Sequence, residues 1–372
     1  MVIGVPKEIK DQESRVSCTP ASVNQFVHEG HTVYVETKAG LESGFTDEQY
    51  RDAGATILEK AEDVWAKADM IYKVKEPIAS EYKYFREDLI IYTYLHLAAD
   101  APLTKELVDK KCVGIAFETV QVGRALPLLK PMSEVAGRMA VQEGAKYLTK
   151  PQGGKGVLLQ GVPGVPPAHV VILGAGVVGT AATRIAVGMG ARVTVLDVNI
   201  DRLGEVADIF LDKIETLYSN NFNIAKVVKD ADLVVSTILI PGHKAPQLIS
   251  EEMVKTMEPG SVIVDVAIDQ GGSTDLTAGR PTTHSNPVFV EHGVVHYAVA
   301  NIPGAVAKTA TQALSNATTR YGVAIANMGW KAACKRFPEL APGVNTAEGY
   351  VTYAPVAEDL GYELKKVEDL IG

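Results

Sequence analysis

Three closely spaced glycines, Gly174, Gly176 and Gly179, form the pattern G-x-G-x-x-G directly after the apolar run Val170–Leu173. The first glycine permits a tight turn, the second lets a pyrophosphate approach the backbone, and the third lets a helix pack against a strand. Asp197 follows 18 residues after Gly179, where an acidic side chain binds the ribose hydroxyls of a dinucleotide. An ordinary glycine turn is the alternative, but the complete strand–helix–strand context favours a dinucleotide site.

Charged side chains also follow several predicted strands. Arg15 lies in the loop after the first strand, and Lys75, His96, Glu118 and Asp269 each follow a later one. Ligands of open α/β sheets bind beyond the carboxyl ends of the strands. We therefore expect cations, an imidazole and carboxylates to converge where a nicotinamide ring would lie.

Each of these residues also has an ordinary explanation. Arg15 could be a surface residue and Lys75 a solvated one, since both types are mostly exposed. His96 could cap a helix or be a buried, hydrogen-bonded histidine, and Asp269 could only form a turn before Gln270-Gly271-Gly272. The sequence contains no Cys/His cluster and no H-E-x-x-H, so we predict no catalytic metal. It also lacks G-x-S-x-G, so a hydrolase has no support.

The composition restricts the class of protein. The chain has 372 residues and a formal net charge of −9, which argues against nucleic acid or an anionic membrane as a partner. No apolar run is long enough to span a bilayer, and the N-terminus is predicted to be a strand rather than a signal peptide. Cys18, Cys112 and Cys334 are far apart and odd in number, so we expect a cytoplasmic protein without disulfides.

The elements that must position these residues alternate between strands and helices, which predicts an α/β fold with parallel sheets. Short apolar runs are typical of buried strands, and glycines mark helix ends. The predicted strands are Val2–Val5, Thr32–Glu36, Met70–Val74, Leu89–Leu95, Val113–Phe117, Val170–Leu173, Arg192–Leu196, one at Leu233, Val262–Ile268 and Val295–Ala300. The predicted helices are Pro20–His28, Asp47–Gly54, Thr104–Lys110, Ser133–Leu148 with Ser133 as its cap, Thr180–Met189 and Thr309–Phe337, followed by a helical tail.

The pattern indicates two α/β domains. Residues 128–306 contain the glycine motif and form the predicted NAD-binding domain. Residues 1–127 lack such a motif, and with residues 307–372 they form the predicted discontinuous substrate domain. Two long helices, near 134–148 and 305–328, would join the domains across a cleft. After Pro303 the strand pattern stops, so we expect the remaining chain to be helical.

Over its whole length the chain resembles the bacterial alanine dehydrogenase/pyridine nucleotide transhydrogenase family, and within it the L-alanine dehydrogenases. The matching stretches are G-V-P-K-E at Gly4, R-V-S-C-T-P at Arg15, S-G-F-T-D-E at Ser43, K-V-K-E-P at Lys73, T-Y-L-H-L-A at Thr93, S-E-V-A-G-R at Ser133, D-Q-G-G at Asp269 and K-T-A-T-Q-A-L-S-N-A-T at Lys308. The resemblance implies two Rossmann-like domains in each chain, and a homohexamer that interconverts L-alanine with pyruvate and ammonium, using NAD.

The resemblance also implies roles for individual residues. Arg15 and Lys75 would bind the substrate, while His96 and Asp269 would be the acid/base pair. The residues implied in NAD binding are Ser133, Gly174, Gly176, Val177, Val178, Gly179, Asp197, Arg202, Ser219, Ile238, Leu239, Val266, Ala267, Ile268, Asp269, Arg280, Val299, Ala300, Asn301 and Ile302.

The chain departs from the family pattern at three places. Arg202 replaces a lysine of some members and should still serve a phosphate or ribose edge. Ala324, Ala326 and Asn327 occupy a region where some members carry metal-binding side chains, so no metal is assigned. The loop S-T-D-L-T-A-G before Arg280 is not a close match.

Two other functions remain open on the sequence. One is the soluble NAD-binding component of a proton-translocating transhydrogenase, which passes hydride between nucleotides and needs no carbon acid/base set. The other is a non-catalytic nucleotide-binding or assembly protein. Formation of NADH from L-alanine and NAD at alkaline pH separates all three.

Overall fold

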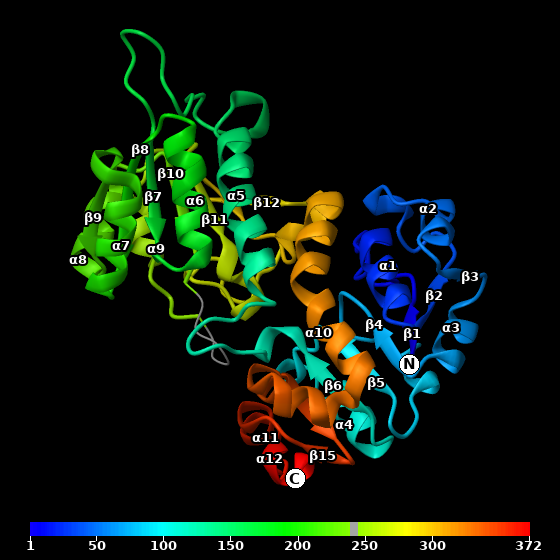
Figure 1. The fold of residues 1–372 in the computed structure, drawn as a ribbon. Helices are drawn as coiled ribbons and strands as arrows, with labels where there is room; N and C mark the ends of the chain where they lie inside the picture. Colours follow the sequence, from blue (N-terminus) through cyan, green and yellow to red (C-terminus); the bar gives the residue numbers. More distant parts are fainter. Residues whose placement is uncertain (239–244) are drawn as a thin grey trace. The chain divides into compact units, whose positions relative to one another are not determined.

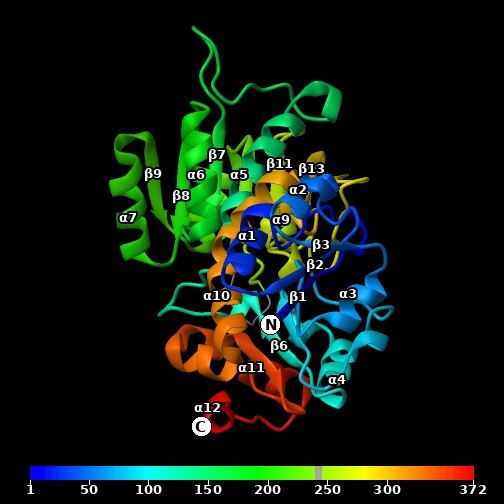
Figure 2. The same cartoon turned by 45° about the vertical axis from the view of Figure 1, so that its right-hand side comes forward.

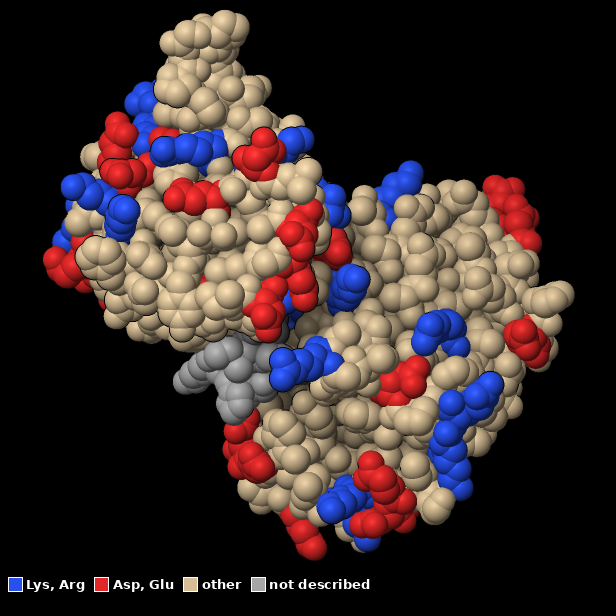
Figure 3. Space-filling view, turned by 60° about the vertical axis from the view of Figure 1, so that its left-hand side comes forward, with Lys and Arg blue, Asp and Glu red and all other residues tan. Residues whose placement is uncertain are grey.

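The computed structural model describes residues 1–238 and 245–372. The chain divides into two compact units, one formed by residues 1–132 and 306–372 and the other by residues 133–305. Each unit contains its own β-sheet (Figure 1). Figure 3 shows acidic and basic side chains interspersed over the visible face of the molecule.

The first unit is built on an eight-stranded sheet with the order β15-β14-β6-β5-β4-β1-β2-β3. Strands β1 to β6 pair in parallel, while β14 and β15 are antiparallel at one edge. The strands are β1 (Val2–Val5), β2 (Thr32–Glu36), β3 (Thr56–Leu58), β4 (Met70–Tyr72), β5 (Ile90–Thr93), β6 (Val113–Ala116), β14 (Val344–Ala347) and β15 (Tyr350–Val351). The helices are α1 (Pro20–His28), α2 (Asp47–Asp52), α3 (Ala61–Lys67), α4 (Ala101–Asp109), α10 (Ala307–Arg336), α11 (Ala354–Leu360) and α12 (Val367–Ile371).

Helices cover both faces of this sheet because alternate strand residues are apolar on opposite sides. Ile71 and Ile91 belong to a buried cluster that includes Trp65 and residues of α4 and α11. The neighbouring Tyr72 and Tyr92 point the other way, where their hydroxyl groups hydrogen-bond Thr318 of α10.

The second unit is built on a seven-stranded sheet with the order β12-β13-β11-β10-β7-β8-β9. Only β12 among these strands is antiparallel to its neighbour. The strands are β7 (His169–Leu173), β8 (Arg192–Asp197), β9 (Ile214–Tyr218), β10 (Leu233–Ser236), β11 (Val262–Asp265), β12 (Val288–Glu291) and β13 (Val294–Tyr297). The helices are α6 (Val177–Gly188), α7 (Ile200–Phe210), α8 (Asn221–Lys229) and α9 (Glu251–Lys255), together with most of α5 (Lys130–Tyr147) (Figures 1 and 2).

Packing in the second unit again alternates along the strands. Val171 and Leu173 of β7 join a cluster with residues of α8 and α9. On α5, a Cβ atom at Gly137 would lie 2.2 Å from the carbonyl oxygen of Val178, so α5 and α6 are in close contact. The predicted α/β architecture with two Rossmann-like, mainly parallel sheets is therefore confirmed.

Three local predictions were wrong. Helix α5 begins at Lys130, with Pro131 in its first turn, so Ser133 lies inside the helix and does not cap it. The strand predicted over Val262–Ile268 ends at Asp265, and a 3₁₀ turn follows over Val266–Gln270. The strand pattern does not stop after Pro303, because β14 and β15 form a hairpin that pairs with β6.

No helix among residues 1–238 and 245–372 is long and apolar enough to cross a membrane.

Candidate active site and nucleotide site

The glycine loop of the second unit has the geometry that its sequence predicts. Gly174 has a φ of +104°, which favours glycine, and a Cβ at Gly179 would lie 1.8 Å from the carbonyl oxygen of Gly174. Gly176 is the N-cap residue of α6, and a Cβ there would have no atom within 4 Å. The loop is therefore tight at its first and third glycines and open at its second, as a pyrophosphate requires.

Asp197 at the end of β8 is fixed beside this loop. One carboxylate oxygen accepts a hydrogen bond from the Ala175 backbone N–H at 2.6 Å, and the other accepts one from the Asn199 N–H at 2.8 Å. The side chain is only half-buried. Each carboxylate oxygen can accept further hydrogen bonds, so the geometry fits a ribose diol.

Arg202 supports the same loop from α7. Its Nη2 donates to the Ala175 carbonyl oxygen at 2.7 Å and to the Thr180 hydroxyl at 3.2 Å. It also forms an ion pair with Glu205. These bonds orient the guanidinium group against the glycine loop.

Two further residues implied in NAD binding, Ser219 and Ile238, follow strands of this sheet. Ser219 follows β9 and is buried, with its N–H bonded to the Asp197 carbonyl oxygen. Ile238 follows β10, and Leu239 lies outside the described residues. The Arg280 guanidinium lies 3.7 Å from the centre of the Phe289 ring.

A buried carboxylate shapes the turn that carries Asp269. Asp265 is fully buried. It accepts hydrogen bonds from the N–H of Ala267 at 3.0 Å, from the N–H and hydroxyl of Ser273 at 2.8 Å each, and from the Thr277 hydroxyl at 2.5 Å. These bonds end β11 and start the 3₁₀ turn, which explains why the predicted strand was too long.

Asp269 itself is exposed on this turn. The cap of the turn is Asp265, not Asp269. The N–H of Asn301, whose φ is +61°, lies 3.5 Å from an Asp269 carboxylate oxygen. The structure thus brings the turn that carries Asp269 and the segment 299–302 together.

In the first unit, Arg15 is buried and paired rather than solvated. Its Nε and Nη2 donate to the two Glu13 carboxylate oxygens at 2.7 and 2.6 Å. Burial opposes the charge, but the hydrogen bonds to Glu13 raise the pKa of Arg15 above its ordinary value. Nη1 lies 3.1 Å from the Met132 sulfur. Glu13 therefore holds the guanidinium group in one orientation.

His96 fits neither of its ordinary explanations. Its side chain is 46% exposed, so it is not a buried, satisfied histidine. It stands at the start of a 3₁₀ turn but makes no side-chain capping bond. Its φ of +49° is strained for a non-glycine residue. Glu118, at the end of β6, accepts the His96 N–H at 2.6 Å and lies 3.8 Å from the ring Nδ1.

Lys75 is half-buried just beyond β4. Its backbone N–H lies 3.3 Å from a Glu8 carboxylate oxygen. Within the first unit, the structure thus confirms that Lys75, His96 and Glu118 follow neighbouring strands of one sheet. The sequence did not reveal the roles of Glu13 and Glu8 as partners, because a lone glutamate carries no signal of what it contacts.

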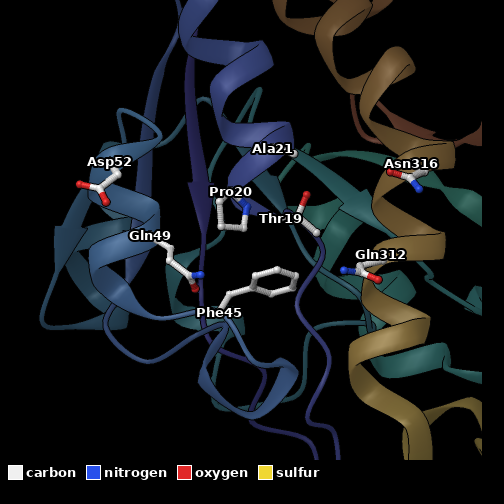
Figure 4. Close-up of a pocket in the computed structure, with 8 residues that line it drawn as sticks. All are labelled: Thr19, Pro20, Ala21, Phe45, Gln49, Asp52, Gln312 and Asn316. Atoms are coloured by element: carbon white, nitrogen blue, oxygen red, sulfur yellow. The ribbon is translucent and has the colours of Figure 1, made fainter.

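A hollow of about 440 Å³ also lies in the first unit (Figure 4). It is lined by Thr19, Pro20, Ala21, Phe45, Gln49, Asp52, Gln312 and Asn316. Arg15, Lys75 and His96 are not among its lining residues, so this hollow is separate from the candidate substrate residues.

Comparisons with known proteins agree with these features. Residues 4–136 match the family model "Alanine dehydrogenase/PNT, N-terminal domain", and residues 140–354 match "Alanine dehydrogenase/PNT, C-terminal domain". The chain is 62% identical over 365 residues to an alanine dehydrogenase of Methanococcus maripaludis, covering 97% of this chain and 98% of that one.

Solved structures of alanine dehydrogenase and of a transhydrogenase also superimpose on this chain. A structure described as L-alanine dehydrogenase superimposes with a TM-score of 0.93 at 48% identity, covering 97% of this chain and 99% of the other. A transhydrogenase from Sinorhizobium meliloti superimposes with a TM-score of 0.80 at 26% identity, covering 95% and 99%. The sequence similarity is thus clearly greater to the dehydrogenases.

Proposed function

The chain belongs to the alanine dehydrogenase/PNT family and catalyses the NAD-dependent oxidative deamination of L-alanine, and we propose that Arg15, Lys75, His96 and Asp269 carry that reaction. The assignment of this reaction rests mainly on the 62% identity to the alanine dehydrogenase of Methanococcus maripaludis, over nearly the full length of both chains. The first unit would be the substrate domain and the second the NAD domain.

The nicotinamide ring, when bound, accepts the hydride from the α-carbon of alanine. The glycine loop fits such a cofactor, because the space over Gly176 is open and the α6 N-terminus faces it. Asp197 would bind the adenosine ribose and repel a 2′-phosphate, which favours NAD over NADP. The other cofactor residues are those of the strand-end segments described above, with Arg202 holding the loop.

Substrate binding would rest on the two cations. Arg15 would bind the substrate carboxylate, oriented for this by Glu13. Lys75 would stabilise the carbonyl oxygen that develops as the iminium becomes pyruvate.

The acid/base work would fall to His96 and Asp269. Loss of hydride leaves an iminium, water adds to its carbon, and the resulting carbinolamine loses ammonia. One proton must leave the water and another must reach the departing nitrogen, and a histidine can do both near neutral pH. Asp269 would orient the water or ammonia and stabilise the positive charge of the iminium.

Substitutions test these roles. Asp269→Asn keeps the shape and removes the charge, so kcat should fall by about 10²-fold or more while NADH still binds. His96→Gln should do the same. Exposed His28 provides a control, since His28→Gln should leave kcat unchanged. Near-normal turnover of either variant, or a loss of activity matched by unfolding, would reject the catalytic role of that side chain.

Assays with nucleotides separate this function from that of a transhydrogenase component. We expect NADH from L-alanine and NAD, and no hydride transfer from NADPH to NAD; the reverse result would favour the transhydrogenase component.

We also propose a homohexamer in the cytoplasm, with L-alanine, pyruvate and ammonium as its small-molecule partners. Sedimentation of the purified chain tests the hexamer.

A further inference from the structure

A buried lysine joins two carboxylates beneath the segment that carries Lys75. Lys73 Nζ lies 3.2 Å from a Glu8 oxygen and 2.9 Å from a Glu81 oxygen. The side chains of Lys73, Glu8 and Glu81 are 1%, 3% and 5% exposed. Burial alone would favour the neutral lysine, but the two carboxylates raise the pKa of Lys73 above its ordinary value. The ammonium group is therefore kept charged inside the unit.

The second oxygen of each carboxylate binds the backbone. Glu8 Oε1 accepts the N–H of Val74 at 2.6 Å and lies 3.3 Å from the N–H of Lys75. Glu81 Oε2 accepts the N–H of Ile78 at 2.9 Å. Both ends of the segment 74–78 are thus held by carboxylates that share one buried cation.

The segment 74–78 lies beyond the end of strand β4 at Tyr72. Its backbone N–H groups at residues 74, 75 and 78 are bound by the Glu8 and Glu81 carboxylates. The Val74 carbonyl oxygen also accepts the Tyr94 N–H at 3.2 Å, and Glu76 forms an ion pair with Lys10, so the carboxylates hold the N–H side of the backbone on both sides of Lys75. A lysine side chain is long and has several rotatable bonds, so the position of its ammonium group depends on the position of the backbone that carries it. A reacting group displaced by about 1 Å can lose about 10²-fold in rate.

We propose that Glu8, Lys73 and Glu81 are positioning residues that fix the 74–78 backbone so that Lys75 meets the substrate oxygen. This inference rests on the role of Lys75 proposed above. Glu8 and Glu81 do not touch substrate in this scheme, and they act only through the segment that they hold.

The test is a set of double-mutant cycles between Glu8 or Glu81 and Lys75. Glu8→Gln keeps the size of the side chain and leaves Lys73 paired with Glu81, so the fold should survive. We expect kcat/KM for pyruvate to fall about tenfold while NADH affinity stays within about twofold. In a Lys75→Ala background, the same Glu8→Gln change should have no further effect on kcat/KM, because its target is already absent.

Asp69→Asn is the control. Asp69 also accepts a backbone N–H, that of Val2 at 2.7 Å, but it precedes β4 and holds no part of the 74–78 segment. It should leave kcat/KM near that of the parent protein. Glu81→Gln acts on the far end of the segment and should reproduce the Glu8→Gln pattern, which keeps the test decisive if one variant folds poorly.

The outcomes separate the two proposals. If Lys75→Ala retains normal kcat/KM, the proposed role of Lys75 fails. If Lys75→Ala is impaired but the Glu8→Gln loss adds to it in full, Lys75 acts in the reaction and the positioning inference is wrong. Equal losses in Glu8→Gln and Asp69→Asn would also overturn it.

Discussion

The two units anchor their candidate reactive residues with buried carboxylates that are compensated in opposite ways. In the first unit, Glu8 and Glu81 face a buried cation, Lys73. In the second unit, Asp265 is surrounded by neutral donors, namely two backbone N–H groups and two hydroxyls. A buried charge needs either an opposite charge or enough hydrogen bonds.

The difference has a structural reason. Lys73 directly follows strand β4, and its side chain reaches both the Glu8 and the Glu81 carboxylates. The Asp265 carboxylate lies against a tight loop rich in serine and threonine, whose donors are short and close. Removal of the one cation leaves both carboxylates without a counter-charge, whereas loss of one neutral donor leaves the others in place. The first unit should therefore be most sensitive to loss of Lys73.

Loss of the buried cation should give the largest effect on stability. Lys73→Met leaves two buried carboxylates without a counter-charge, which should lower the free energy of unfolding by about 3–5 kcal/mol. Urea unfolding of the purified protein measures this. Lys255→Met is the control, since Lys255 also contacts two carboxylates, Glu251 and Glu252, but these three side chains are 40%, 45% and 81% exposed. Its cost should be much smaller; equal costs would remove the contrast.

Acid should act on the second unit through a buried neutral histidine. His296 is fully buried, and burial, with help from Arg280 and His292, lowers its pKa from 6.5 to about 4. Below pH 6.5 the unfolded chain takes up a proton that the folded chain does not. Stability should therefore fall by up to about 3 kcal/mol as the pH drops from 6.5 to 4.

The variant His296→Phe should reduce this acid loss, because a phenyl ring takes up no proton. The ring also keeps the contact with Phe289, whose ring centre lies 4.9 Å from that of His296. Melting curves between pH 4 and 7 measure the change. Exposed His28→Gln should melt like the parent at every pH. An unchanged acid dependence in His296→Phe would mean that another group causes the loss.

Weakening the neutral network should have a smaller effect. In Asp265→Asn, one oxygen becomes an N–H₂ group that faces donors, so some of the four hydrogen bonds are lost. We expect a loss of about 2 kcal/mol in the free energy of unfolding, with a lower kcat because the Asp269 turn loosens. Asp275→Asn provides the control, since Asp275 accepts an exposed N–H of Glu251 in the same region. If both variants behave alike, Asp265 does not organise the turn.

The smallest effect should come from Asp197, a carboxylate that is anchored by two N–H groups but only half-buried. Asp197→Asn should reduce the preference for NAD over NADP by about tenfold, or about 1.4 kcal/mol. The ratio of kcat/KM for the two nucleotides measures it, with exposed Asp201→Asn as control. A parent protein that uses both nucleotides equally would contradict the assignment.

The sequence alone determined those features that depend on neighbouring residues in the chain. The glycine loop was predictable because the positive φ of Gly174 and the missing Cβ of Gly179 depend only on nearby backbone. The positions of Lys75 and His96 after strands β4 and β5 were predictable because apolar runs mark buried strands.

Contacts between distant residues were decided only by the tertiary structure. The start of α5 before Ser133, the early end of β11 at Asp265 and the hairpin β14–β15 each depend on partners that no local pattern reveals. The strongest case is Glu8, which binds the Val74 N–H from 66 residues away. A glutamate near the N-terminus is equally compatible with solvent and with burial, and only the folded sheet, which places β1 beside β4, brings it to Lys73.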